Sequence, residues 1–285
     1  MTPGTGGVAV VTDSTSTLPR STPARFGIRV VPLRVQVGER TGTDGVDVTS
    51  TDVVNALRER VVVSTSRPTP AQFAQAFSEA LDAGASYVVS VHLSSALSGT
   101  WESAVLAAQD FPHGVVRVVD SRSTAMGLGF AVLAAAECAD AGGGPAEVQG
   151  AAASVVDRTR TMFYVDTLEY LRRGGRIGTA AALLATSLSV KPLLQMVEGQ
   201  LVPMEKVRTT SKAIARLVAA TAAAAGTGPV DLAVHHLAAA DRAARVAEQL
   251  HAALPQLDEI QVAELGPVLG AHLGPGVIGT VSVRR

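Results

Sequence analysis

The chain has 285 residues, of which 47% are hydrophobic, 17% charged and 4% aromatic, and its formal net charge is −1. This length and composition predict a folded protein of about two domains and exclude a disordered chain. The small net charge provides no general attraction to nucleic acid or an anionic membrane, and the single cysteine, Cys138, excludes an internal disulfide and a multi-cysteine metal site.

The N-terminus and the apolar runs of the sequence indicate the cellular location expected for the protein. The first residues, MTPGTGGVAVVTDS, have no charged segment followed by a long apolar run, so we predict no signal peptide. No apolar run of about 18 residues is free of charge, glycine or proline in the way a membrane span requires. We therefore expect a cytoplasmic protein with no membrane span.

The first half of the chain alternates strand and helix signals. We predict strands at 8–12, 28–37 (interrupted by Pro32), 87–93 and 115–119, and helices at 49–60, 69–82, 100–108 and up to residue 139. Thr49 with Asp52, and Thr69 with Gln72, have the spacing of capping boxes at helix starts. Because such alternation requires right-handed crossover connections, we expect a mainly parallel sheet flanked by helices.

Hydroxyl-rich loops follow the predicted strands of this half. These loops are residues 12–17, 64–69, 94–100 and 120–124. In open α/β sheets, ligands bind beyond the carboxyl ends of the strands. We therefore expect the hydroxyl groups to gather at one edge of the sheet.

A glycine-rich segment, Asp140–Pro145, separates the two halves, and a helix at 146–159 is predicted to follow it. Later elements are expected at 161–165, 166–172, a hairpin at 193–202 that turns at Glu198–Gln200, 209–225, 230–235, 239–253, 259–264 and 277–283. We predict an α/β protein with two domains, residues 1–157 and residues 158–285, the second with a mixed sheet.

Two hydroxyl-rich segments are candidates for anion binding. Ser64–Pro70 and Leu93–Thr100 each place hydroxyl groups before a predicted helix, and a helix N-terminus favours an anion such as a carboxylate. Ordinary turn and capping chemistry accounts for the same residues, so both interpretations stay open.

A third candidate is His272, which lies between glycine-rich turns in Glu264–Gly276. It is either a neutral core histidine or a hydrogen-bond donor to an oxyanion. We interpret the remaining histidines as structural or surface residues: His92, His113, His235, His236 and His251.

Basic residues are concentrated in one stretch of the second half. They are Arg172, Arg173, Arg176, Lys191, Lys206, Arg208 and Lys212. Such a cluster is either a solvated face or a patch that meets a phosphate or an acidic partner.

Several motifs of known chemistry are absent from the sequence. There is no phosphate-binding loop of the P-loop type, no complete dinucleotide fingerprint, no nucleophile elbow around Ser98 and no zinc motif. We therefore predict no cofactor and no metal.

The chain resembles the DegV family, the fatty-acid-binding subunits of bacterial fatty acid kinase. The resemblance rests on six segments in the family's order: Val11–Pro19, Thr65–Pro70, Ser94–Thr100, Val119–Gly129, Phe163–Ile177 and Gly266–Gly276. It implies a two-domain DegV-like fold with one long-chain fatty acid, such as palmitate or oleate, bound between the domains.

By motif position, the resemblance implies that Thr65, Ser95 and His272 bind the fatty-acid carboxylate. Ser94 and Ser98 are close alternatives to Ser95, and Arg208 resembles an arginine that assists His272 at the head group. For the acyl-chain tunnel we predict residues 126–133 and 181–194, with Met126 and Leu128 as individual candidates. The chain departs from the family in two places: Arg67 stands where glutamine is usual, and Leu273 where a small polar residue is common.

The function expected from these residues is a lipid-binding protein rather than an enzyme. It presents the carboxylate to an ATP-dependent fatty acid kinase subunit, which docks through the patch of Arg172, Arg173 and Arg176 and forms an acyl phosphate. One alternative is a stand-alone acyl hydrolase or transferase that uses a serine, His272 and either Asp13 or Asp120. Another is a regulatory protein whose lipid is structural.

Overall fold

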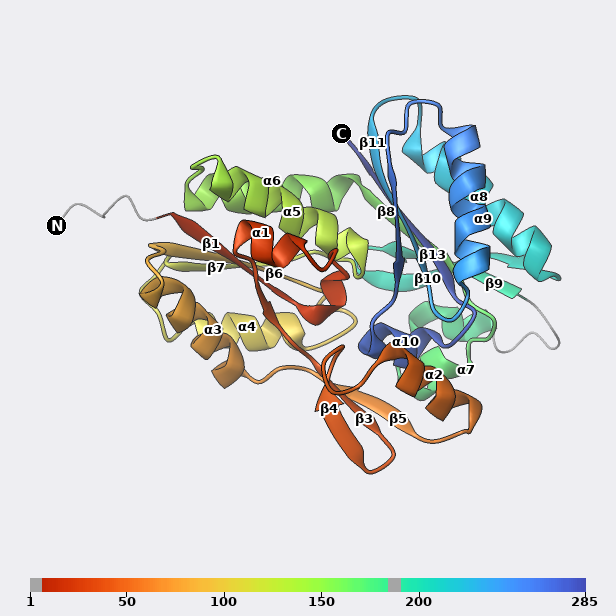
Figure 1. The fold of residues 1–285 in the computed structure, drawn as a ribbon, viewed down its shortest axis with the longest axis horizontal. Coiled ribbons are helices and arrows are strands. Elements are labelled where there is room, and N and C mark those ends of the chain that lie inside the picture. The colour runs from red at the N-terminus through yellow and green to blue at the C-terminus, as the bar shows by residue number, and fades with distance from the viewer. Residues whose placement is uncertain (1–6, 184–190) are drawn as a thin grey trace. The chain divides into compact units, whose positions relative to one another are not determined.

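The computed structural model describes residues 7–183 and 191–285 (Figure 1). The chain forms two compact units: the residues up to Arg34 with Ser66–Asp157, and Val35–Thr65 with Arg158–Arg285. The predicted domains, 1–157 and 158–285, share the junction near Asp157 with these units but place Val35–Thr65 differently. The sequence pattern of this segment identifies its own strands and helix, but does not indicate which core they join.

The first unit is built on a four-stranded parallel sheet, as predicted. Its strands are β1 (Val8–Asp13), β2 (Arg29–Val31), β6 (Tyr87–His92) and β7 (Val116–Asp120), in the order β2-β1-β6-β7. All three neighbouring pairs are parallel. Short valine-rich strands of this kind suit a sheet that is covered on both faces.

Helices cover both faces of this sheet. They are α1 (Thr22–Phe26), α3 (Pro70–Asp82), α4 (Thr100–Ala108), α5 (Met126–Asp140) and α6 (Pro145–Arg158), with a 3₁₀ turn, η1, at Ser14–Ser16. Figure 1 shows α3 and α4 on one side of the sheet and α5 and α6 on the other. Phe73 and Phe77 of α3 are fully buried against the sheet, and the predicted capping box of Thr69 and Gln72 is present.

The predicted strand at 28–37, which Pro32 interrupts in the sequence, is not one element in the structure. It is divided into β2 and β3 (Arg34–Val37), which belong to different sheets. Pro32 lies at the break, and proline cannot donate to a strand ladder. Leu33 donates its backbone N–H to the Ser14 hydroxyl instead, at 3.1 Å.

A small sheet and one helix make up the segment that joins the second unit. Strands β3, β4 (Arg40–Thr43) and β5 (Val63–Ser66) pair in the order β4-β3-β5, and α2 (Ser50–Arg58) begins with the predicted capping box. The expectation that residues 64–69 form a loop at the edge of the parallel sheet is therefore wrong. Ser64, Thr65 and Ser66 lie in β5, which pairs within this other sheet.

The main sheet of the second unit has six strands and is mixed, as predicted. Its strands are β8 (Thr159–Tyr164), β9 (Lys191–Val197), β10 (Gln200–Val207), β11 (Val230–His236), β12 (Ile260–Glu264) and β13 (Ile278–Arg284). The order is β10-β9-β8-β13-β11-β12, and of these pairs β11 with β12 is parallel. The β9–β10 hairpin turns at Glu198–Gly199, where both residues have positive φ angles.

Helices α8 (Thr210–Ala225) and α9 (Ala240–Ala253) pack on this sheet through a core that includes Leu217, Val246 and Leu250. Three further helical segments, α7 (Glu169–Arg173), η2 (Gly178–Leu183) and α10 (Pro267–Leu273), are short. Helix α10 was not predicted, because its glycine and proline residues indicate turns. Pro267 instead occupies the first helical turn, and Gly274 ends the helix with φ of +76°.

None of the helices within residues 7–183 and 191–285 is both long enough and apolar enough to cross a lipid bilayer.

Candidate functional site

The structure brings together two of the predicted head-group residues, Thr65 and His272. Thr65 lies in β5 and His272 lies near the end of α10, and both belong to the second unit. The Thr65 Oγ1 atom is 2.8 Å from Nε2 of His272, so the two side chains share a hydrogen bond. They are 207 positions apart in the sequence, and folding of the Val35–Thr65 segment into the second unit makes this contact.

Glycines leave room for the imidazole and for the loop that follows it. A Cβ atom added to Gly174 would lie 2.2 Å from Nδ1 of His272, so the ring occupies space that a side chain would fill. Gly274 and Gly276 have φ angles of +76° and +87° and lie against Tyr170 and Asp166 in the same way. Glycine is therefore required at both positions of this late motif, because a side chain there would collide with Tyr170 or Asp166.

The imidazole of His272 is neutral at neutral pH. Burial and, to a smaller extent, the positive charge of Arg176 together lower its pKa to about 4. Its Nδ1 atom is buried and has no hydrogen-bond partner among the residues that the structure describes. No carboxylate therefore orients this ring through Nδ1 within that part of the chain.

A neutral His272 allows Thr65 to present either a donor or an acceptor. If Nε2 carries the proton, it donates to Thr65 Oγ1, and the threonine hydroxyl is free to donate to a third group such as a carboxylate. In the other tautomer Thr65 donates to Nε2, and its oxygen can only accept, for example from a protonated carboxylic acid. The pair can therefore recognise a carboxyl group in either protonation state.

The three predicted serines lie in the first unit, in the loop that follows β6. The Ser95 hydroxyl donates to Oδ2 of Asp120 at 2.6 Å, so its proton is already used. Ser94 is fully buried, and its hydroxyl accepts the backbone N–H of Ala96. Ser98 is half-buried and pairs with the hydroxyl of Thr100 at 2.9 Å. Of the three, Ser98 keeps its proton available when Thr100 acts as the donor in this pair.

Arg67, one of the two departures from the family pattern, lies against the same loop. Its Nη1 atom donates to the Gly99 carbonyl oxygen at 3.4 Å. A Cβ atom added to Gly99 would meet Nη1 at 1.6 Å, so this glycine makes room for the guanidinium. Leu273, the other departure, provides no donor beside His272.

A buried array of Asp13, His92 and Ser90 was missed by the sequence analysis. Asp13 Oδ2 lies 3.0 Å from His92 Nδ1, and Ser90 Oγ lies 2.6 Å from His92 Nε2. The order of contacts matches that of a catalytic triad, but all three side chains are fully buried. Asp13 also accepts the backbone N–H of Leu93 and two bonds from Thr15, so the array fixes the ends of β1 and β6.

The register of the parallel sheet brings the residues of this array together. Val11 of β1 is paired with Ser90 of β6, and continuing by two residues places Asp13 beside His92. The sequence shows both residues at strand ends, but it does not show which strands are neighbours.

The remaining predicted site residues are Arg208, Met126 and Leu128. Arg208 is exposed, precedes the N-cap of α8 and has no ion-pair partner among the described residues. Met126 and Leu128 are fully buried at the start of α5. Of the tunnel segment 181–194, the side chains of 182–190 lie outside the described residues. The tunnel remains a prediction.

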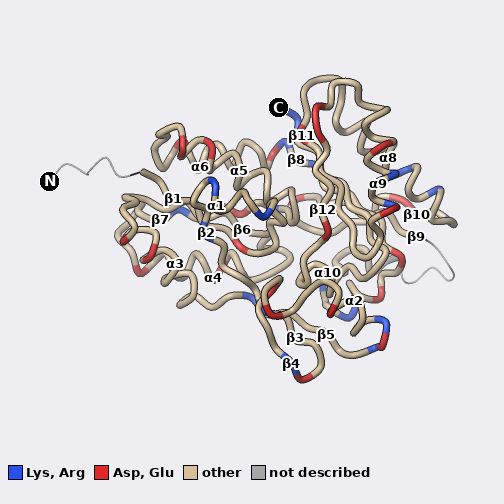
Figure 2. The backbone as a smooth tube through the Cα atoms, in the orientation of Figure 1, with Lys and Arg blue, Asp and Glu red and all other residues tan. Residues whose placement is uncertain are grey.

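The predicted docking patch has less free positive charge than the sequence suggests. Arg172 and Arg173 both bind Glu169, at 2.8 and 2.7 Å, and these contacts lower the pKa of that carboxyl group to about 2. Arg176 donates to the Gly174 carbonyl oxygen. Figure 2 shows both basic and acidic residues in the backbone trace.

Within the described part of the chain, no group of three or more histidine, cysteine, aspartate or glutamate side chains could hold a metal ion.

Comparisons with known proteins agree on one family. The family model described as "Uncharacterised protein, DegV family" matches residues 7–285. A DegV domain-containing protein of Streptomyces coelicolor is 51% identical over 278 residues, which cover 98% of this chain and 99% of that protein.

Two solved structures are also similar across the whole chain. One is described as "Fatty Acid Binding of a DegV family Protein from Thermus thermophilus"; it has a TM-score of 0.93 and 37% identity, and the match covers 98% of this chain and 100% of that one. The other, DegV of Bacillus subtilis, is described as a fatty acid binding protein; it has a TM-score of 0.89 and 31% identity, with the same coverage.

Proposed function

Because this chain belongs to the DegV family, we propose that it binds one long-chain fatty acid and presents the carboxyl group to an ATP-dependent fatty acid kinase subunit. The descriptions of the T. thermophilus and B. subtilis proteins support the class of ligand. The observation that carries the proposal is the 2.8 Å contact between Thr65 and His272, whose neutral imidazole has an unused buried nitrogen.

The energetics favour a ligand that is mostly apolar. Burial of a fatty acid of about 16 carbons yields roughly 0.8 kcal/mol per methylene, or on the order of 10 kcal/mol before the costs of association. An isolated buried carboxylate would oppose this gain strongly. Tight binding therefore requires hydrogen-bond donors at the head group, and few other polar contacts.

Thr65 is the donor we assign to the carboxylate, with His272 as the group that orients it. When His272 donates from Nε2, the threonine proton points to the ligand, and the negative charge of the ligand stabilises a proton on the imidazole. Ser94, Ser95 and Ser98 remain predicted further donors. Ser95 can donate only if it releases Asp120, so we rank Ser98 above it.

Presentation to the kinase is the second part of the proposal. In the reaction, a carboxylate oxygen attacks the terminal phosphorus of ATP held by the kinase, and ADP leaves, which forms the acyl phosphate. Arg208 is exposed and without an ion-pair partner among the described residues, so it is available to neutralise the phosphoryl oxygens in that complex. Arg176 belongs to the arginine patch that we predicted for docking of the kinase. It donates a hydrogen bond to the carbonyl oxygen of Gly174, the residue against which His272 packs.

The contacts count against a stand-alone acyl hydrolase. Among the described residues, His272 has no carboxylate on Nδ1, and Asp120 binds Ser95 directly without an intervening histidine. Asp13 is occupied by His92 in an array that solvent does not reach. A triad needs its histidine between the nucleophile and the carboxylate.

Mass spectrometry of lipid extracted from the purified protein tests the binding proposal. We expect about one fatty acid per chain, and rebinding of palmitate or oleate after the lipid is removed. A protein that carries no lipid and has no affinity for either fatty acid would refute it.

Reconstitution with the kinase and ATP tests presentation separately. We expect acyl phosphate only when the loaded protein, kinase and ATP are all present, and a reduced rate with Arg208→Ala. Acyl ester turnover by the protein alone, lost in Ser98→Ala, would instead support the hydrolase. Lipid that is retained but never phosphorylated would support a structural lipid.

A further inference from the structure

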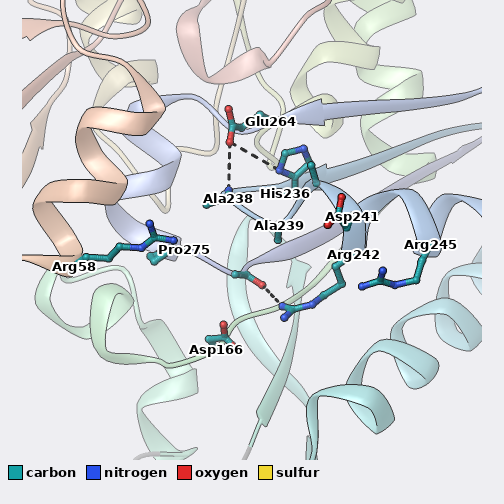
Figure 3. Close-up of a pocket in the computed structure, with 12 residues that line it drawn as sticks. Arg58, Asp166, His236, Ala238, Ala239, Asp241, Arg242, Arg245, Glu264 and Pro275 are labelled. Atoms are coloured by element: carbon teal, nitrogen blue, oxygen red, sulfur yellow. Dashed lines mark hydrogen bonds and ion pairs between the residues drawn. The ribbon is translucent and has the colours of Figure 1, made fainter.

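A second polar site lies elsewhere in the second unit. A pocket of about 660 Å³ opens where the ends of β11 and β12 meet the start of α9 (Figure 3). This volume is in the range that binds small molecules. Neither Thr65 nor His272 is among its lining residues, so the pocket is distinct from the proposed head-group site.

The start of α9 provides unsatisfied backbone donors at this pocket. Helix α9 has 14 residues, and its N-cap, Ala239, has no side chain that can cap the helix. Ala238, Ala239 and Ala240 all line the pocket, and their small side chains leave the backbone accessible. Free N–H groups at a helix start favour an anion.

His236 is a buried polar residue at this pocket. The residue is only 9% exposed and lines the pocket, yet its Nδ1 atom has no hydrogen-bond partner among the described residues. Its Nδ1 atom lies 4.0 Å from Glu264 Oε1, which is too far for a hydrogen bond but is an ion-pair distance when the imidazole is protonated. Figure 3 shows this ring beside Ala238 and Glu264.

The charges of the pocket leave its arginines available. Arg58, Arg242 and Arg245 line it, and none of them forms an ion pair with a carboxylate among the described residues. Arg242 donates only to the Gly276 carbonyl oxygen, at 2.9 Å, and Figure 3 shows the three side chains arriving from different positions around the pocket.

The carboxylates of the pocket are mostly engaged with protein donors. Asp166 accepts from Tyr164 and from Lys191, and Glu264 accepts the Ala238 N–H at 3.3 Å. Asp241 is exposed in the first turn of α9 and remains available to accept from a ligand.

We propose that this pocket binds a small organic phosphate that also carries hydroxyl groups, such as a nucleoside or sugar phosphate. The guanidinium groups and the start of α9 suit the phosphate, because arginine binds phosphate oxygens through paired N–H groups. Asp241, which is exposed in the first turn of α9, suits hydroxyl groups, because a carboxylate accepts hydrogen bonds from them. The pocket volume exceeds what an inorganic phosphate ion alone would fill.

Isothermal titration of the fatty-acid-loaded protein with AMP tests this proposal, with inorganic phosphate and adenosine as comparison ligands. We expect AMP to bind, and both comparison ligands to bind at least about tenfold more weakly, because each lacks one half of the contacts. Arg58→Ala and Arg245→Ala should each weaken AMP binding by about tenfold. Arg20→Ala is the matched control, because Arg20 is exposed and does not line the pocket.

Absence of AMP binding at millimolar concentration would overturn the proposal, as would equal weakening by Arg20→Ala. Adenosine or inorganic phosphate that binds as tightly as AMP would also contradict it. The NMR signals of His236 provide a check that does not depend on the arginine variants, since we expect AMP to shift them. Palmitate retention is measured separately, so failure of this site is distinguishable from failure of fatty-acid binding.

Discussion

The imidazole of His272 fits against the Cα atom of Gly174, where a Cβ atom would lie 2.2 Å from Nδ1. Gly174 has φ of −74° and ψ of −8°, a conformation that alanine adopts without strain. The glycine is therefore required by its neighbour and not by its backbone. A substitution of Gly174 can therefore displace the His272 ring while Thr65 and His272, the two residues of the hydrogen bond, stay unchanged.

We predict that Gly174→Ala weakens palmitate binding by about tenfold or more, because the displaced His272 no longer orients Thr65. Titration of the delipidated protein with palmitate measures the effect. Gly150→Ala, on the exposed face of α6, is the control, since nothing lies within 4 Å of its added Cβ atom. Equal affinity of Gly174→Ala and the control, with both variants folded, would contradict the role of His272.

The pKa of His272 provides a second prediction. NMR titration of the lipid-free protein should place it at about 4, because burial and Arg176 disfavour the charged ring. Bound anionic palmitate should raise it, and so should Arg176→Gln in the free protein, because each change makes the local potential more negative. A value near 6.5 in the free protein, unaffected by palmitate, would contradict the proposed environment.

Stability should fall as the pH drops from about 6.5 to about 4. Burial lowers the folded-state pKa of both His235 and His272 to about 4, so in this window the unfolded chain binds more protons than the folded one. Each histidine contributes at most roughly 3 kcal/mol to the free energy of unfolding. This contribution is fully present above the pKa of the unfolded state and is lost as the pH falls toward the pKa of the folded state. Urea unfolding at pH 7 and pH 5 measures this loss.

The variant His235→Leu should flatten that pH dependence, because it removes one of the two groups. His251→Asn is the control, since His251 is exposed. A pH dependence that is the same in His235→Leu and wild type would show that His235 does not contribute in this way.

The buried array around Asp13 should be important for stability rather than for turnover. In Asp13→Asn, an amide NH2 group replaces one carboxylate oxygen. This group would face either Thr15 or the N–H donors of His92 and Leu93. We therefore expect the free energy of unfolding to fall by about 2 to 4 kcal/mol. Urea unfolding measures it, with exposed Asp82→Asn as the control, expected within about 0.5 kcal/mol of wild type. A loss below 1 kcal/mol for Asp13→Asn would contradict this account.

Much of the fold was predictable because its signals are local. The capping boxes at Thr49 and Thr69 predicted the starts of α2 and α3, and the alternating strand and helix patterns predicted the parallel sheet of the first unit. The β3–β4–β5 sheet was not predicted, because its strands are short and have no distinctive apolar pattern. Pro32 marks the break between β2 and β3, but the sequence does not show that these two strands join different sheets.

The candidate site was predictable only through family resemblance. The residues alone left Thr65 and His272 with ordinary structural interpretations, since their contact spans 207 positions. The engagement of Ser95 by Asp120 depends on the pairing of β6 with β7, which places the ends of these strands side by side. Sequence could not separate Ser94, Ser95 and Ser98, because the competition for their protons depends on this pairing.

The central claim is that Thr65 and His272 bind the carboxyl group of a fatty acid, and palmitate labelled with ¹³C at its carboxyl carbon tests it most directly. We predict one bound carboxyl NMR signal per chain, which shifts in Thr65→Val and His272→Asn but stays unchanged in Thr41→Val, an exposed position in β4 at the far edge of the same small sheet. A bound carboxyl signal that is identical in all three variants, or no bound signal at all, would contradict the claim.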